Sequence, residues 1–361
     1  MSLGKLTVNG RRDGFLCEGK PFFWFADTCW SAFTSITEAD WDYYLTRRAE
    51  QGMNVLQINT LPQWDRCCPD LGIWPYASED GVHFDWSQPN QAYWDRAAAM
   101  CRAAVEHGIR PALVLMWCNY VPGTWGAKIA ERCGADVMPR EEVRAHVARV
   151  VENLGEFDPV YVVTGDTDFA GDEAIAYYED ALDEVAKRAP EALRTMHINR
   201  GNRTIPAQYL DRLDFYMFQP GHNYEGQPEA WRLPQDFIAN YPKKPMVNSE
   251  PCYEQMGASR NVYWRFTAQD CRASVWSSIL AGASAGVTYG AHGVWNWQTS
   301  KSQGSVLGEG FDMPFRWQEC LQFAGVWDFA AIEHVLAGLG ATACDGALAV
   351  VPAQELLDDA R

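Results

Sequence analysis

The chain has 361 residues, of which 47% are hydrophobic and 21% charged, and its formal net charge is −17 at pH 7. This length and composition exclude a disordered chain and allow either one large α/β barrel or two ordinary domains. Because so negative a chain repels phosphate groups, we expect neither nucleic acid nor an anionic membrane surface as a partner.

The sequence contains no apolar run near the roughly eighteen residues that a membrane span needs, and no charged-then-apolar leader opens it. Its eleven cysteines are an odd number and include no CxxC pair. This usage favours reduced, buried thiols over a disulfide framework. We therefore expect a cytoplasmic protein, with a leader outside this sequence as the alternative.

The hydrophobic pattern predicts a regular succession of strands and helices. Residues 5–20 predict a hairpin that turns near Asn9 and Gly10. Short apolar runs then predict eight strands at 22–26, 54–58, 110–115, 159–163, 195–198, 215–218, 245–247 and 286–289. Helical patterns lie between them at 37–51, 93–107, 141–154, 173–187 and 270–283, and again within 314–336.

Eight strands that are apolar throughout, each ending in polar or aromatic residues, are typical of a (β/α)8 TIM barrel. The alternative is a doubly wound open sheet, whose GxGxxG fingerprint is missing from the sequence, as is a phosphate-binding GxxxxGK[ST] loop. We expect residues 1–20 to form a β entry packed on the barrel and 21–335 to form the barrel. Residues 336–361 should be a small C-terminal extension with a candidate strand at 347–351.

Sixteen tryptophans are an unusual number, and many of them stand beside Asn, Asp, Gln or Gly rather than inside apolar runs. Flat, partly polar rings suit the stacking of sugars or bases, and the net charge argues against bases. The other interpretation is that large rings fill the interface between barrel and helices. The long loop between 59 and 90 carries Trp64, Trp74, Tyr76 and Trp86, and loops of this length are usually functional.

Two carboxylates follow predicted strands on opposite sides of the barrel, Asp166 after the fourth strand and Glu250 after the seventh. In a closed barrel both point into the mouth, where TIM barrels place their chemistry. Glycoside hydrolysis needs such a pair, one carboxyl as proton donor and one as nucleophile or base. The alternatives are an N-cap role for Asp166, a proton-donor role for Asp168, and an ordinary surface position for Glu250.

Other polar and aromatic residues at strand ends are candidates for sugar contacts. Asp27 either bonds a hydroxyl or pairs with an arginine, and Cys118 and Cys252 are expected to be spectators. No HExxH, calcium loop or GxSxG elbow occurs, so we expect no metal and no cofactor. The expected substrate contacts are Asp27, Trp30, Asn59, Trp117, Asn119, Trp125, Gln219, His222, Tyr253, Tyr289, His292 and Trp295.

Four segments in matching order resemble the apiosidase-like glycoside hydrolases (glycoside hydrolase family 140-like): GKPFFW at 19–24, QPGH at 219–222, NSEPCYE at 248–254 and TYGAHGVW at 288–295. The resemblance implies a (β/α)8 barrel that acts on plant-type polysaccharide. It also implies an acid/base aspartate after strand four and a nucleophilic glutamate after strand seven, which fall on Asp166 and Glu250.

The chain departs from the pattern of these hydrolases at three places. Strand four ends in Thr164-Gly165-Asp166 rather than Gly-Gly-Asp, and strand five ends in Asn199-Arg200 where His-Pro is common. Only a short stub follows residue 335, where most relatives carry a β-domain.

Our hypothesis is a glycoside hydrolase with a retaining mechanism, in which Asp166 is the general acid/base and Glu250 the nucleophile. The first alternative is a non-catalytic sugar-binding barrel. The second is a different barrel hydrolase or lyase that uses Arg200 and His222 on a carboxylated substrate.

Overall fold

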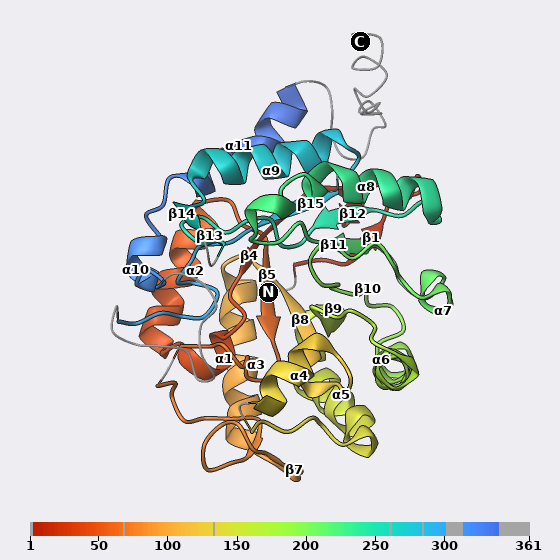
Figure 1. The fold of residues 1–361 in the computed structure, drawn as a ribbon, viewed down its shortest axis with the longest axis vertical. Coiled ribbons are helices and arrows are strands. Elements are labelled where there is room, and N and C mark those ends of the chain that lie inside the picture. Colours follow the sequence, from red (N-terminus) through yellow and green to blue (C-terminus); the bar gives the residue numbers. More distant parts are fainter. Residues whose placement is uncertain are drawn as a thin grey trace.

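The computed structural model describes residues 3–67, 69–132, 134–259, 262–283, 285–300 and 313–338. Eight parallel strands form one sheet in the spatial order β10-β9-β8-β5-β4-β15-β12-β11, and helices surround it (Figure 1). The strands are β4 (Trp24–Thr28), β5 (Val55–Asn59), β8 (Arg110–Trp117), β9 (Val160–Gly165), β10 (Arg194–Thr195), β11 (Tyr216–Phe218), β12 (Met246–Asn248) and β15 (Gly286–Tyr289). The predicted TIM barrel is confirmed.

The two end strands of this sheet, β10 and β11, close the barrel with isolated contacts instead of a ladder. The backbone N–H of Asp214 donates to the carbonyl of Arg194 at 2.9 Å, and the Thr195 hydroxyl donates to the carbonyl of Phe215 at 2.8 Å. The fifth strand, β10, ends at Thr195 and is shorter than the predicted 195–198. Beyond β10, Ile198 still forms a parallel bridge with Thr167, so the backbone continues along the barrel wall.

Helices follow most barrel strands. They are α1 (Ala32–Ser35), α2 (Glu38–Glu50), α3 (Gln91–Glu106), α4 (Trp125–Arg132), α5 (Arg140–Leu154), α6 (Asp172–Arg188), α7 (Ala207–Leu210), α8 (Glu229–Asn240), α9 (Ala268–Leu280), α10 (Trp317–Cys320) and α11 (Gly325–Gly338). The sequence pattern does not predict α8, which contains Pro234 in its interior, a residue that normally ends a helix. Short 3₁₀ turns add η1 (Cys118–Tyr120), η2 (Gly155–Phe157) and η3 (Tyr224–Gly226).

Small antiparallel sheets lie at both ends of the barrel. The long loop after β5 contains β6 (Tyr76–Ala77) and β7 (Asp85–Pro89), and the segment after β12 contains β13 (Gly257–Ser259) and β14 (Val262–Arg265). At the N-terminus, β1 (Leu6–Val8), β2 (Phe15–Cys17) and β3 (Lys20–Phe22) form an antiparallel sheet. The predicted entry hairpin is thus present, with a third strand added.

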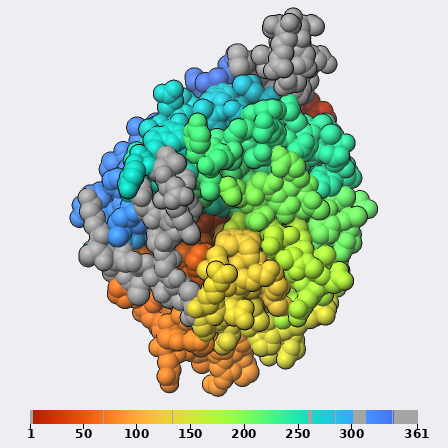
Figure 2. Space-filling view, in the orientation of Figure 1, coloured from red at the N-terminus to blue at the C-terminus, as the bar shows by residue number. Residues whose placement is uncertain are grey.

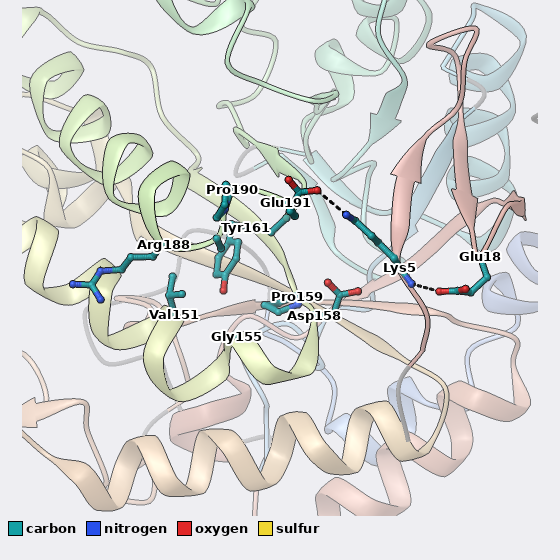
Figure 3. A pocket seen from close by; sticks show the side chains of 12 residues that line it. Lys5, Glu18, Val151, Gly155, Asp158, Pro159, Tyr161, Arg188, Pro190 and Glu191 are labelled. Carbon is teal, nitrogen blue, oxygen red and sulfur yellow. Dashed lines mark hydrogen bonds and ion pairs between the residues drawn. The ribbon is translucent and has the colours of Figure 1, made fainter.

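A cavity of about 630 Å³ lies where this N-terminal segment meets the loops that precede β9 and β10 (Figure 3). Lys5 ties the segment down, since its ammonium pairs with Glu191 at 2.8 Å and its backbone N–H donates to Glu18 at 2.6 Å. Because the loops lead into the strands, the cavity lies at the end of the barrel opposite the carboxyl ends of the strands, where TIM-barrel chemistry takes place.

The predicted strand at 347–351 lies outside the described residues. Of the helices in the described ranges, none is long and apolar enough to cross a membrane.

Candidate active site

Glu250 follows β12 directly, and its carboxylate is held by two histidines. His222, from the loop after β11, lies with Nε2 2.7 Å from Oε1, and His197, just beyond β10, lies with Nε2 3.1 Å from Oε2. Beneath the site, the Gln57 amide donates across the barrel to the carbonyl of Ser249 at 3.0 Å. Three barrel strands therefore fix the position of one carboxylate.

The backbone defines which nitrogen of each histidine carries the proton. The N–H of Asp166 donates to Nδ1 of His197 at 3.2 Å, and the N–H of Tyr253 donates to Nδ1 of His222 at 3.3 Å. With Nδ1 accepting, each ring carries its proton on Nε2: Nε2 of His222 donates to Oε1 of Glu250 at 2.7 Å, and Nε2 of His197 faces Oε2 at 3.1 Å. Burial alone raises the pKa of Glu250, but the hydrogen bonds from His197 and His222 outweigh it and lower this pKa to about 2.

Asp166 follows β9 in the left-handed conformation, with φ of 54°. Its Oδ1 accepts a hydrogen bond from the Gln219 amide at 2.5 Å, and its carbonyl accepts one from the Trp125 indole at 2.7 Å. Burial, and next the charge of Glu250, raise the pKa of Asp166 to about 7, against the opposing effects of His197 and the Gln219 hydrogen bond. The two acids therefore share one site, and Asp166 keeps its proton to a much higher pH than Glu250 does.

Aromatic rings form one wall of the site. Trp117 lies 5.8 Å from His197 in a stacked arrangement, and Trp30 packs against both rings at 5.1 Å and 5.6 Å. The Trp30 indole donates to the Tyr253 hydroxyl at 3.1 Å, and the Tyr253 ring lies 4.1 Å from that of His222. Two tryptophans and a tyrosine, which follow β4, end β8 and follow β12, therefore line the site of the carboxylate pair.

Two glycines provide the space for these rings. A Cβ on Gly165 would lie 2.1 Å from the Trp117 ring, and a Cβ on Gly290 would lie 2.0 Å from the Tyr253 ring. No side chain fits at either position without displacing a wall residue. The absence of a side chain at Gly165 therefore leaves room for the Trp117 ring, and the same glycine leads into the turn at Asp166.

Several buried polar atoms near the mouth have no partner within the described structure. Both amide atoms of Asn59, Oδ1 of Asn119 and Nε1 of Trp117 belong to residues that are at most 5% exposed. Asn59 ends β5, Trp117 ends β8, and Asn119 lies in the η1 turn that follows. Unsatisfied buried polar groups are costly, so they indicate a place where a bound molecule completes the hydrogen bonding.

Two predicted substrate contacts belong to a different network below the mouth. Asp27 is fully buried and pairs with Arg48 at 2.6 Å, and the Tyr44 hydroxyl donates to the same carboxylate oxygen. The Tyr289 hydroxyl donates to Glu254 at 2.6 Å, and the Tyr289 ring lies 5.4 Å from the Arg48 guanidinium. Of the two roles considered for Asp27, the structure shows the arginine pairing, and the Tyr289 hydroxyl is likewise engaged by Glu254.

His292 and Trp295 lie together after β15. The Trp295 indole donates to Nδ1 of His292 at 3.1 Å, and the two rings stack at 6.2 Å. The carbonyl of Trp295 accepts the backbone N–H of Ser31, which joins this segment to the loop after β4. Both side chains are buried beside the mouth.

The structure also gives the positions of Asp168, Cys118 and Cys252. Asp168 is not the N-cap of α6, because Gly171 occupies that position. Cys118 and Cys252 are buried free thiols. Throughout the described ranges, no group of three or more His, Cys, Asp or Glu side chains is arranged to hold a metal ion.

The amino-acid sequence of the chain matches that of a known protein family. Residues 12–342 match the family described as apiosidase-like, catalytic domain. The chain belongs to this family. The resemblance noted in the sequence is thereby confirmed, and this apiosidase-like chain is a glycoside hydrolase with a carbohydrate substrate.

Solved structures share the barrel of the apiosidase-like chain. A glycoside hydrolase is 22% identical, with 93% of this chain and 75% of that chain covered and a TM-score of 0.73. A glycoside hydrolase family 5 protein from Bacteroides vulgatus is 21% identical, with 92% and 71% covered and a TM-score of 0.75. A family 5 mannosidase from Rhizomucor miehei is 14% identical, with 91% and 97% covered and a TM-score of 0.59. No curated protein sequence matches the chain.

Sequence reasoning missed His197, which contacts both acids of this apiosidase-like site. The residue lies inside the predicted fifth strand, where a histidine reads as an interruption of an apolar run. The backbone at His197 is held at two points. The Thr164 hydroxyl donates to the His197 carbonyl, and Ile198 forms a parallel bridge with Thr167. A polar residue in a strand that is otherwise buried on both faces was the signal available in the sequence.

Proposed function

We propose that this glycoside hydrolase cleaves a plant-type poly- or oligosaccharide by a retaining mechanism, with Asp166 as acid/base and Glu250 as nucleophile. The observation that supports the proposal is the separation of the two pKa values, about 7 for Asp166 and about 2 for Glu250, within one buried site. Carboxyl groups whose environments move their pKa values apart are suited to divided acid and nucleophile roles.

In the first step, protonated Asp166 donates its proton to the glycosidic oxygen while a Glu250 oxygen attacks the anomeric carbon. The bond to the leaving sugar breaks, and a glycosyl ester with Glu250 forms. In the second step, ionised Asp166 removes a proton from water, the water oxygen attacks the same carbon, and Glu250 leaves as a carboxylate. Asp166 is then protonated again, and the configuration at the anomeric carbon is retained.

The histidines keep Glu250 ready for this attack. His222 donates to one oxygen of Glu250 and His197 lies beside the other, and both favour the ionised carboxylate. Gln219 positions Asp166 through its amide and is itself held near the wall by a second bond to the carbonyl of Ile198. Both acids therefore approach the substrate in fixed orientations, as general acid catalysis requires.

The remaining predicted contacts divide into ring faces and hydroxyl partners. Asn59 and Asn119 have buried amide atoms available to sugar hydroxyls. The faces that we assign to sugar stacking are Trp30, Trp117, Trp125, Tyr253 and Trp295, and the further hydroxyl partners are Gln219 and His292. Both ring nitrogens of His222 are engaged by Glu250 and the Tyr253 backbone, so we assign His222 to positioning Glu250. Asp27 and Tyr289 are not among these contacts, because they hold the network around Arg48.

A screen of aryl glycosides and pectic oligosaccharides with Asp166→Asn, Glu250→Gln and the matched control Asp168→Asn tests these roles. We expect the first two variants to lose most activity and Asp168→Asn to keep it. NMR of the first-formed product should show the anomeric configuration of the substrate. Activity that survives both Asp166→Asn and Glu250→Gln would remove their roles, and an inverted product would make Glu250 or Asp166 a general base.

A further inference from the structure

The backbone of Asp166 is held at both of its polar groups. Its N–H donates to Nδ1 of His197 at 3.2 Å, and its carbonyl accepts the indole N–H of Trp125 at 2.7 Å. Asp166 has φ of 54° and Phe169, three residues later, has φ of 50°, so both adopt the left-handed conformation that side chains disfavour. Strained backbone of this kind persists only where the surrounding structure fixes it. The two bonds to Asp166 therefore hold a conformation that is unfavourable on its own.

Trp125 itself is held in place because the helix that it begins is docked on the preceding turn. A Cβ on Gly126 would lie 2.5 Å from Sγ of Cys118, so the first turn of α4 lies directly against η1. The Thr124 hydroxyl donates to the carbonyl of Cys118 at 2.5 Å and accepts the N–H of Ala127 at 3.2 Å, as a helix-capping side chain does. The indole of Trp125 thus projects from a fixed first turn.

The segment that leads into α4 and the segment after Asp166 are in contact at a second point. A Cβ on Gly123 would lie 3.1 Å from the carbonyl oxygen of Ala170, so little space separates the two backbones there. The ring of Trp64, from the long loop after β5, meets the Trp125 ring edge-on, with centroids 6.4 Å apart. In Figure 2 the gold segment that contains α4 borders the hollow at the centre of this face. Trp125 is therefore supported from the loop after β5 while its N–H edge is bound to Asp166.

We propose that Trp125 is a positioning residue for the general acid. Its indole N–H holds the carbonyl of Asp166, which keeps this residue left-handed and its carboxyl group directed at the leaving oxygen. The inference rests on the proposed function, because it takes Asp166 as the acid/base. Proton donation depends on geometry first, and a displacement near 1 Å can cost about 100-fold in rate. This role belongs to the edge of the indole, so it is independent of sugar stacking on its face.

Two replacements remove the bond with different effects on the shape of the ring. Trp125→Phe keeps a flat ring against Trp64, and 3-benzothienylalanine at position 125 keeps the shape of the indole and replaces its N–H with sulfur. In crystal structures of both variants, Asp166 should leave the left-handed region and its carboxyl oxygen should move away from the Gln219 amide. Trp64→Phe, the matched control, keeps the bond and should leave Asp166 as it is in the wild-type chain.

Rates with two leaving groups show whether the displaced group is the acid. The probes are the 2,4-dinitrophenyl and phenyl glycosides of the sugar that the wild-type chain hydrolyses. Dinitrophenolate departs without a proton, whereas the departure of phenolate is assisted by a proton from the acid. Both replacements of Trp125 should lower kcat/KM about 10- to 100-fold for the phenyl glycoside and less than about threefold for the dinitrophenyl glycoside. Trp64→Phe should change both values by the same factor.

An Asp166 that keeps its positive φ and its bond to Gln219 in both variants would overturn the positioning role, as would equal losses with the two glycosides. Asp166→Asn on the same pair of glycosides judges the proposed function separately. A loss confined to the phenyl glycoside supports the acid role of Asp166, and equal losses remove it. Selective loss in Asp166→Asn without selective loss in the Trp125 variants would leave the acid role standing and remove the positioning role. An Asp166 that moves in the Trp125 variants while Asp166→Asn shows equal losses would leave Trp125 as a support of the backbone and remove the acid.

Discussion

Nε2 of His197 lies 3.1 Å from Oε2 of Glu250, while Nδ1 of the same ring accepts the backbone N–H of Asp166. One side chain from strand five thereby connects strands four and seven. A change in its protonation or position alters the environment of both acids together, which makes the site a coupled unit rather than two independent groups.

The pH dependence of kcat/KM follows from the two pKa values. Asp166 must be protonated to donate and Glu250 must be ionised to attack, so activity should be highest between about 2 and about 7. It should fall above about 7 as Asp166 loses its proton. Gln219→Leu removes a donor that stabilises ionised Asp166, so its pKa should rise and the alkaline limb should move to higher pH. An alkaline limb that stays in place or moves to lower pH in this variant contradicts the assignment.

His197→Phe tests the donor to Glu250 while keeping a flat ring against Trp117 and Trp30. Loss of a hydrogen bond to a charged group, about 1.5–3 kcal/mol, should lower kcat/KM by about 10- to 150-fold. The pKa of Glu250 should rise, so the acid limb of the pH profile should move upward. His222→Phe, which removes the other donor, should move it in the same direction. An unchanged acid limb in both variants would show that the histidines serve packing alone.

Gly165→Ala tests whether the position of the Trp117 ring depends on the absence of a side chain at residue 165. Its Cβ would lie 2.1 Å from the Trp117 ring, so the indole must move and the adjoining Asp166 turn must shift with it. A displacement near 1 Å in such a site can cost about 100-fold in rate. Steady-state kinetics should show this loss, whereas Gly10→Ala, where no atom lies within 4 Å of the new Cβ, should leave kcat/KM unchanged. Wild-type kinetics for Gly165→Ala would mean that Trp117 does not contact substrate.

The sequence predicts those features of the barrel that depend on local pattern. Strands buried on both faces read as apolar runs, which is why β8 and β9 were found almost to their ends. Both acids were located because each follows such a run, and their roles stay a prediction.

Features that depend on tertiary packing were not predicted from the sequence. The ladder of β10 contains only two residues, so its pattern did not single out His197 as a residue facing the site. The partner of Asp27 is an arginine on the next long helix, and only the packing of α2 against the barrel shows that the pair forms. The same holds for Tyr289, whose hydroxyl partner Glu254 lies on the loop after β12.

The buried pair of Asp27 and Arg48 makes a prediction about stability rather than activity. Both side chains are at most 1% exposed, so Asp27→Ala leaves a buried guanidinium with only Gln51 and the rings of Tyr44 and Tyr289 around it. Removing one partner of a buried ion pair typically costs about 3–5 kcal/mol in the free energy of unfolding. Urea unfolding followed by tryptophan fluorescence should show this loss for Asp27→Ala and for Arg48→Ala.

The double replacement Asp27→Leu with Arg48→Met separates pairing from packing. It removes both charges and restores apolar volume, so it should be more stable than either single variant, as found generally when a buried ion pair is replaced by hydrophobic residues. Hydrolysis per folded molecule should remain close to the wild-type value in the double variant, because the carboxylate of Asp27 is held by Arg48 and Tyr44. A large loss of activity in a folded double variant would instead show that the Asp27 network acts on the catalytic pair above it.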